Sequence, residues 1–167
     1  MKTTRILILT LALAGCTTFN GNDLVPGRST AAEAETMMGA ASQRLKLANG
    51  DTAFYFSRLP LGRAMYVVTF GPDGVMKSKE QRMQYGYFAK VVANSWGKKE
   101  VAELLGPPGR AGRFDRMNRD WWEYRYRQDM DYRVVWVQFS DDGVVREMYD
   151  MLDPDEERKK DGMSWSN

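Results

Sequence analysis

Two stretches of the chain carry the same sequence signals in the same order, and this internal repeat limits the folds open to it. Each stretch begins with a short helix-forming segment that ends at a glycine, and the two glycines, Gly39 and Gly106, are 67 residues apart. Alternating apolar and polar residues follow, with Tyr55 and Tyr124 separated by 69 residues. A repeat of this length predicts two related structural units in tandem.

Each unit is predicted to contain a helix followed by three antiparallel strands. The strand signals cover residues 52–58 and 65–70 in the first unit and 121–127 and 134–139 in the second, and each second strand leads into an Asp-Gly turn. Asp-Gly supplies the positive φ that hairpin turns need. Residues 84–92 predict an additional helix before the second repeat. The fold class is therefore α+β, and units of this size are expected to share or abut their cores.

The first fifteen residues have the pattern of a secretory signal peptide. Lys2 and Arg5 precede an apolar run over residues 6–14, which is too short for a membrane span of about 20 residues. The segment ending in Leu13-Ala14-Gly15-Cys16 resembles the lipobox of bacterial lipoproteins. The resemblance implies cleavage before Cys16 and attachment of lipid, including palmitate, to its thiol.

By the same resemblance, Thr17 after the lipidated cysteine implies the outer membrane of a Gram-negative bacterium, with the protein facing the periplasm. Several acyl chains on Cys16 give stable anchoring without a transmembrane helix. The charge balance agrees with removal of the leader. The whole chain has 24 basic and 22 acidic residues, and both basic residues of the leader are lost, so the chain from Cys16 has a net charge of zero. The basic excess therefore indicates no anionic partner, and the compartment argues against nucleic acid.

The composition excludes several kinds of catalytic site. The chain has no His and one Cys, so it lacks a His general base, a Ser-His pair and a thiolate metal cluster. No phosphate loop or paired-carboxylate motif is present. We therefore expect a protein that is not an enzyme, with no metal, no small-molecule substrate and no cofactor besides the lipid on Cys16.

The second repeat resembles a known family over about residues 85–150. The segments that carry the resemblance are Phe88 to Val91, Gly97 to Val101, Leu104 to Pro107, Trp122 with Tyr124, and Val137 to Val145. They are similar to the SmpA/OmlA (BamE-like) domain of outer-membrane lipoproteins. The tandem pair also resembles the architecture of the beta-lactamase inhibitor protein. These resemblances imply a two-layer α/β sandwich in each unit.

Period-2 alternation predicts which strand residues could bind a partner. If Tyr124 faces the helices and Tyr55 is its equivalent, their neighbours point to a sheet face without helices. That face would carry Phe54, Phe56, Met65, Val67, Arg125, Arg127 and Trp136. Aromatic residues, Met and Arg are enriched at interface hot spots. The alternative is that the two repeats pack these faces against each other as core.

A second candidate site is the basic segment that contains Arg110, Arg113 and Arg116. It reads as a loop that could contact anionic lipid or peptidoglycan. The acidic groups of residues 153–167 read as solvated charge on a charged C-terminal tail.

The sequence thus predicts five regions: a signal peptide at 1–15, a flexible tether at 16–27, a first α/β module at 28–82, a second, BamE-like module at 83–152, and the tail at 153–167. The functional hypothesis is a lipid-anchored periplasmic protein-binding module in envelope assembly or maintenance. Two alternatives remain open: a periplasmic inhibitor of an envelope enzyme, and a structural lipoprotein that binds lipid or peptidoglycan.

Overall fold

The computed structural model describes residues 19–164 of the 167-residue chain. The predicted signal peptide and the lipid site at Cys16 therefore lie outside the described residues. Within residues 19–164, no helix is both long enough and apolar enough to cross a membrane.

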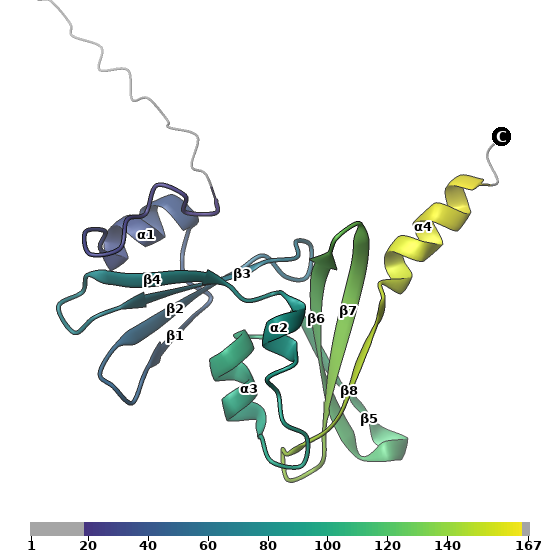
Figure 1. The fold of residues 1–167 in the computed structure, drawn as a ribbon. Coiled ribbons are helices and arrows are strands. Elements are labelled where there is room, and N and C mark those ends of the chain that lie inside the picture. Colours follow the sequence, from purple (N-terminus) through teal and green to yellow (C-terminus); the bar gives the residue numbers. More distant parts are fainter. Residues whose placement is uncertain (1–18, 165–167) are drawn as a thin grey trace, which may run out of the picture.

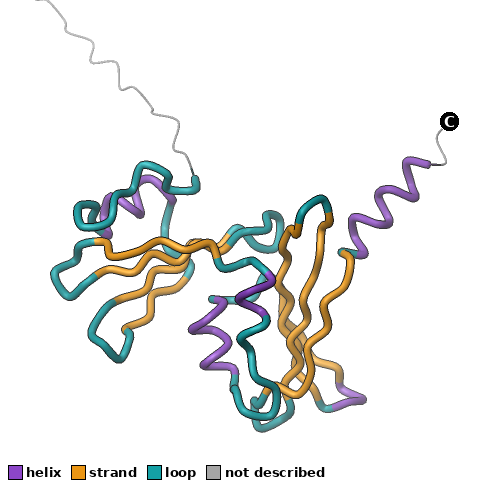
Figure 2. The backbone as a smooth tube through the Cα atoms, viewed as in Figure 1, coloured by secondary structure: helices purple, strands orange, loops and turns teal. Residues whose placement is uncertain are grey.

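The fold is α+β, with two four-stranded antiparallel sheets, as Figures 1 and 2 show. The first sheet has the order β1-β2-β3-β4 and the second β5-β6-β7-β8. The strands are β1 (Gln43–Lys46), β2 (Thr52–Ser57), β3 (Met65–Phe70), β4 (Met76–Gln81), β5 (Arg110–Phe114), β6 (Arg119–Gln128), β7 (Asp131–Phe139) and β8 (Val145–Leu152). The helices are α1 (Ala31–Met38), α2 (Tyr85–Phe88), α3 (Lys98–Leu105), α4 (Pro154–Ser164) and the 3₁₀ turn η1 (Asp115–Met117).

The prediction of three strands in each sheet is wrong because the first strand of each sheet was missed. β1 has only four residues, two of them basic and exposed. β5 lies in the arginine-rich segment that was predicted to be a loop. In both strands the pairing with the next strand, rather than the apolar pattern, establishes the extended backbone.

Two helix predictions also need correction. The helix expected over residues 84–92 is reduced to the four-residue α2. The charged tail instead forms α4 up to Ser164. Asp153 begins α4 because its side chain accepts a hydrogen bond from the Asp155 amide at 3.1 Å, and Pro154 occupies the first helical position, where no amide hydrogen is needed.

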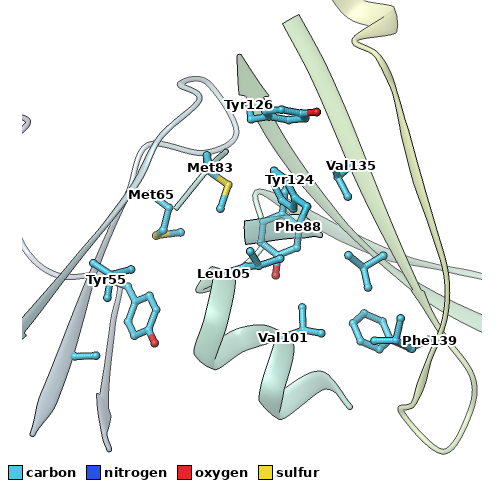
Figure 3. Packing of buried hydrophobic residues seen from close by; sticks show 14 residues of the cluster. Tyr55, Met65, Met83, Phe88, Val101, Leu105, Tyr124, Tyr126, Val135 and Phe139 are labelled. Carbon is cyan, nitrogen blue, oxygen red and sulfur yellow. The ribbon is translucent and has the colours of Figure 1, made fainter. Parts of the chain in front are cut away.

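The helices and sheets stack in alternating layers (Figure 1). α1 covers one face of the first sheet, in a cluster that contains Ala34, Met38, Phe56 and Phe70. α2 and α3 lie between the two sheets, and a single larger cluster joins both repeats there. Figure 3 shows Val101 and Leu105 of α3 between Tyr55 of the first sheet and Phe139 of the second. The two repeats therefore share a core.

The alignment of the two repeats shifts by one residue in the second strand of each sheet. Phe70 pairs with Thr52, and the equivalent Phe139 pairs with Asp120, so these strands correspond at a separation of 68 residues. The structural equivalent of Tyr124 is consequently Phe56, not Tyr55. A one-residue slip moves every side chain of a strand to the opposite face.

This shift explains why the predicted common face in the first sheet is wrong. In the pairing of β2 with β3, Phe54 lies opposite Val68 whereas Tyr55 lies opposite Val67. Phe54 and Phe56 therefore point toward α1, while Met65 and Val67 point toward α3 with Tyr55. Phe56, Met65 and Val67 are each at most 1% exposed, so both faces of the first sheet are covered.

The helix caps show the same repeat at the level of hydrogen bonds. Thr30 and Glu33 form a capping box at the start of α1. At the start of α3, Glu100 accepts a hydrogen bond from the Gly97 amide at 2.9 Å. Thr30 also forms an isolated bridge to Val75, and Gly97 forms the equivalent bridge to Val144. Each helix is thereby tied to the last strand of its own sheet.

Gly106, which ends α3, provides a test of the shared core. Its φ is +79°, and a Cβ there would approach Tyr55 Cδ1 to 2.8 Å and Met65 Cε to 3.0 Å. Gly39, its equivalent after α1, has a φ of +84° but has only Phe19 Cε2 at 4.0 Å from such a Cβ. We expect Gly39→Ala to cost about 1–3 kcal/mol from backbone strain. Gly106→Ala should cost about 1–3 kcal/mol more because the clash adds to that strain.

The measurement is the free energy of unfolding in urea for both variants. Equal losses for the two glycines would contradict a core in which α3 packs tightly against the first sheet.

Candidate functional site: the outer face of the second sheet

The second sheet packs α2 and α3 against one face only, and its other face carries a distinct set of side chains. The register of the strands places these residues, because directly paired residues share a face. The outer face carries Arg110, Gly112 and Phe114 from β5, Trp121, Glu123, Arg125 and Arg127 from β6, Val134, Trp136 and Gln138 from β7, and Glu147, Tyr149 and Met151 from β8.

Three aromatic rings cluster on this face. Trp121 and Trp136 stack with ring centroids 5.7 Å apart and an interplanar angle of 24°. Phe114 lies 6.0 Å from the first ring and 6.1 Å from the second. All three side chains are half-buried and belong to neither buried cluster. We call Phe114, Trp121 and Trp136 the aromatic platform.

Gly112 makes room for the aromatic platform. A Cβ at this position would lie 2.5 Å from Trp121 Cζ2 and 2.7 Å from Cε2. Gly112 pairs directly with Trp121 across β5 and β6. The indole therefore lies over the bare backbone of β5, a placement that any other residue there would prevent.

A buried charge network adjoins the platform. Trp136 Nε1 donates a hydrogen bond to Glu123 Oε2 at 3.1 Å. The other carboxylate oxygen accepts from Arg125 Nε at 3.0 Å. Glu123 is 5% exposed and Arg125 is 8% exposed. Since buried charges are tolerated only when they are paired and hydrogen-bonded, these contacts fix both the indole and the guanidinium.

The network continues to the start of α4 and to the first repeat. Arg125 pairs with Asp155 and, at 3.4 Å, with the fully buried Asp153. Arg63, from the loop between β2 and β3, reaches Asp153 at 3.0 Å and Glu156 at 2.8 Å. The loop of the first sheet, the outer face of the second sheet and α4 are thereby held in one arrangement.

The network shifts the acidity of its carboxyl groups. Hydrogen bonds from Arg125 and then Arg158 lower the pKa of Asp155 from 3.8 to about 2. Hydrogen bonds from Lys159 and then Arg63 lower the pKa of Glu156. Both groups therefore stay ionised in the folded state at pH values where they begin to protonate in the unfolded chain.

Of the residues predicted to bind a partner, three lie on this outer face. Trp136 stands in the platform, and Arg127 is exposed and donates to the Asp129 carbonyl at 2.9 Å. Arg125 is directed to the same face, but its guanidinium is consumed by Glu123 and Asp155. The remaining predicted residues, Phe54, Phe56, Met65 and Val67, lie in the first sheet and are not brought near this face.

The three arginines of the predicted anionic contact do not form one patch. Arg110 is on the outer face, 3.8 Å from Glu123 and 3.6 Å from Asp155. Arg113 has the opposite orientation in β5 and pairs with Asp120 and Asp141, whose hydrogen bonds raise its pKa. Arg116 is in η1 and is exposed. Strand alternation separates side chains that a loop would have left adjacent.

Sequence reasoning missed Phe114, Trp121, Tyr149 and Met151 as members of the outer face. The signal for Trp121 was present, since it precedes Trp122 and must take the opposite orientation in a strand. Phe114 could not be placed because β5 was taken for a loop. Tyr149 and Met151 are exposed on β8 opposite Trp136 and Val134, and their strand was predicted only at its first residue.

Comparisons with known proteins leave the family of this chain open. No family model matches it, and no curated protein matches it either. Among solved structures, it is similar to the crystal structure of a DUF4309 family protein (YjgB) from Bacillus subtilis subsp. subtilis str. 168. That similarity has 12% identity and a TM-score of 0.30, and covers 79% of this chain and 84% of the other. Across residues 19–164, no group of three or more His, Cys, Asp or Glu side chains is arranged to hold a metal ion.

Replacement of Gly112 should disrupt the aromatic platform. We expect Gly112→Ala to displace Trp121, because the new Cβ would overlap its ring, and to cost about 1–3 kcal/mol. The coupling between stacked indoles should weaken, which near-ultraviolet circular dichroism measures. Gly86→Ala is the matched control, since no atom lies within 4 Å of a Cβ there. An unchanged spectrum in the Gly112 variant would contradict the stacked platform.

The acid dependence of stability should reflect the Asp155 carboxyl. Its pKa is lower in the folded state, so its stabilisation is complete above the unfolded value of 3.8 and is lost as the pH falls toward about 2. We expect the free energy of unfolding to decline less steeply across this window in Asp155→Asn than in the unmodified protein. Asp131→Asn, at an exposed site between β6 and β7, should leave the slope unchanged. Parallel slopes for all three proteins would disprove the linkage.

Proposed function

We propose that this protein is an outer-membrane lipoprotein that binds another protein of the cell envelope. Lipid on Cys16 would anchor the chain, and the domain that follows would face the periplasm. The work of the domain would be recognition, in envelope assembly or maintenance, without a catalytic step or a cofactor besides the lipid. The observation that carries the proposal is the aromatic platform on the open face of the second sheet.

The chemistry of this face supports a protein partner. Trp, Tyr and Arg are enriched among residues that dominate binding energy, and they act best when clustered and surrounded by polar groups. The platform is bordered by exposed Tyr149 and Met151 on β8 and by the Glu123–Arg125 pair on β6. Most charges of the face already have partners within the protein, so an incoming surface would meet apolar rings inside a neutralised rim.

The rigidity of the platform adds to this argument. Gly112 sets the position of Trp121, and Glu123 holds the indole nitrogen of Trp136. A surface that is ordered before binding loses little side-chain entropy when the partner arrives. The same face could serve the alternative proposal, inhibition of an envelope enzyme. In that case only the second sheet would contact the enzyme, since Phe56 is buried in the first.

The binding test uses photocrosslinking in the envelope of a Gram-negative host. A photoreactive residue in place of the exposed Tyr149 should crosslink to one predominant envelope protein. Replacement of Trp136 by Ala should reduce that adduct at least tenfold, because each well-packed hot-spot residue contributes about 2 kcal/mol or more to binding.

Arg116→Ala is the control, since this exposed side chain lies in η1 outside the outer face. Circular dichroism of the purified variants verifies that they remain folded. A crosslink that persists unchanged in the Trp136 variant would overturn the assignment of the surface. Loss of labelling by radioactive palmitate in Cys16→Ser, with sedimentation of the unmodified protein in the outer-membrane fraction, tests the anchor separately. Palmitate labelling that persists in that variant would refute it.

A further inference from the structure

The first sheet has an edge strand whose backbone is positioned to pair with another strand. β1 is hydrogen-bonded to β2 alone in the order β1-β2-β3-β4. The Leu47 amide donates to the Asp51 carbonyl at 2.8 Å, which makes Leu47 and Asp51 a hydrogen-bonded pair. Because such pairs alternate along an antiparallel ladder, the backbone groups of Arg44 and Lys46 point away from β2.

A cleft runs beside this edge, between the first sheet and α3. Its larger part is a cavity of about 370 Å³ with apolar walls formed by Leu47, Ala53, Tyr55, Trp96 and Leu104. This volume lies within the range of about 300–1,000 Å³ typical of ligand sites. Leu47 follows β1 directly in the chain, so the cavity opens next to the strand edge.

The larger cavity is held open by hydrogen bonds to the end of α3. Tyr55 Oη donates to the Glu103 carbonyl at 2.5 Å. Arg82 Nη1 donates to the same carbonyl at 3.0 Å and to the Leu104 carbonyl at 2.9 Å. These bonds satisfy carbonyls that the helix itself leaves without partners. They also fix the distance between α3 and the sheet, so the cavity exists before any ligand binds.

A smaller cavity of about 130 Å³ continues the cleft along β1. Gln43, Leu45 and Ala102 line it together with the aliphatic and charged parts of Lys46 and Lys99, and Glu103 is shared with the larger cavity. Neither lysine forms a salt bridge with any residue in the described part of the chain. The smaller cavity therefore has an apolar floor beside two available positive charges.

We propose that an extended segment of a partner protein adds to β1 as a fifth strand and places alternate side chains in the two cavities. An aromatic or large aliphatic side chain would enter the larger cavity. An acidic side chain would lie in the smaller one, against Lys46 and Lys99. Successive side chains on one face of a strand are about 7 Å apart, so two such residues separated by one position reach neighbouring sites along β1. Backbone hydrogen bonds supply affinity and the cavities supply specificity in this mode of recognition.

The charge of the edge selects this occupant over a second copy of the chain. β1 reads Gln43-Arg44-Leu45-Lys46, and pairing it with its own copy would bring basic side chains together across the new interface. Like charges on paired strands are destabilising, and charged edge residues are a known protection against self-association. An acidic strand converts the same charges into attraction.

The site differs from the surface in the proposed function. It lies in the first sheet, whereas the aromatic platform lies in the second. The inference therefore goes beyond the proposed function, and either one can fail without the other.

Binding of defined peptides to the full chain in lipid nanodiscs tests this inference. The probes are two fluorescein-labelled octapeptides, Thr-Val-Thr-Phe-Thr-Glu-Thr-Val and the version with Phe and Glu exchanged, because the direction of the added strand is open. Fluorescence anisotropy should show saturable binding of one of them. Replacing its Glu with Lys, or its Phe with Ser, should weaken binding at least tenfold. Methylation of alternate backbone amides should also weaken it at least tenfold.

The protein variants separate strand addition from a simple charge effect. Lys46→Pro removes an amide hydrogen that points away from β2 and should weaken binding at least tenfold, whereas Lys46→Ala keeps that hydrogen and should weaken it about threefold. Ala102→Arg should abolish binding by filling the smaller cavity. Thermal unfolding verifies that each variant is folded. Trp136→Ala should bind the peptide normally, which separates this site from the aromatic platform.

Three results would overturn the inference. The first is absence of saturable binding by both peptides to the folded protein. The second is equal binding by the methylated peptide or by Lys46→Pro, which would exclude strand addition. The third is a concentration-dependent dimer that Lys46→Pro dissociates while the peptides do not bind, which would make the edge an interface between two copies of this chain.

Discussion

The packing of α3 between two sheets is the constraint on which the rest of the structure depends. Two tyrosines, one from each sheet, hydrogen-bond the end of this helix: Tyr55 to the Glu103 carbonyl at 2.5 Å and Tyr124 to the Gly106 carbonyl at 3.0 Å. Burial raises the pKa of Tyr124, so its hydroxyl stays neutral and keeps donating. Gly106 has no Cβ, which lets Tyr55 and Met65 close over the same point. A helix that forms in one repeat thus completes the core of both.

This packing determines which surfaces remain for recognition. The first sheet has α1 on one face and α3 on the other, so it offers only its edge at β1 and the cleft beside it. The second sheet has helices on one face, and its other face carries the aromatic platform. The charge network through Arg63, Arg125 and Asp153 then holds the two halves and α4 together. Open surface and stabilising contacts are therefore distributed unequally between two similar repeats.

Much of the repeat architecture could be predicted from the sequence, while the orientation of side chains in the first sheet could not. The Asp-Gly turns and the glycines that end α1 and α3 placed the elements in order. The match of Tyr55 with Tyr124 was wrong by one residue, since both are aromatic and only the pairing through Phe70 and Phe139 identifies Phe56 as the equivalent. β5 was missed because its extended backbone comes from pairing with β6, and its residues lack an apolar pattern. The candidate surface was consequently predicted only in part, through Trp136 and Arg127.

The sequence by itself determined the class of the fold, α+β in two tandem units, because glycine stops, period-2 strands and Asp-Gly turns act over a few neighbouring residues. It also supplied the expectation of a lipid anchor, which depends on a short leader motif. Only the tertiary structure decided that α3 serves both sheets, that Arg125 is consumed by Glu123 and Asp155, and that Gly112 lies under Trp121. Those facts depend on strand register and on contacts between distant segments, and a shift of one residue reverses which side chains meet the solvent.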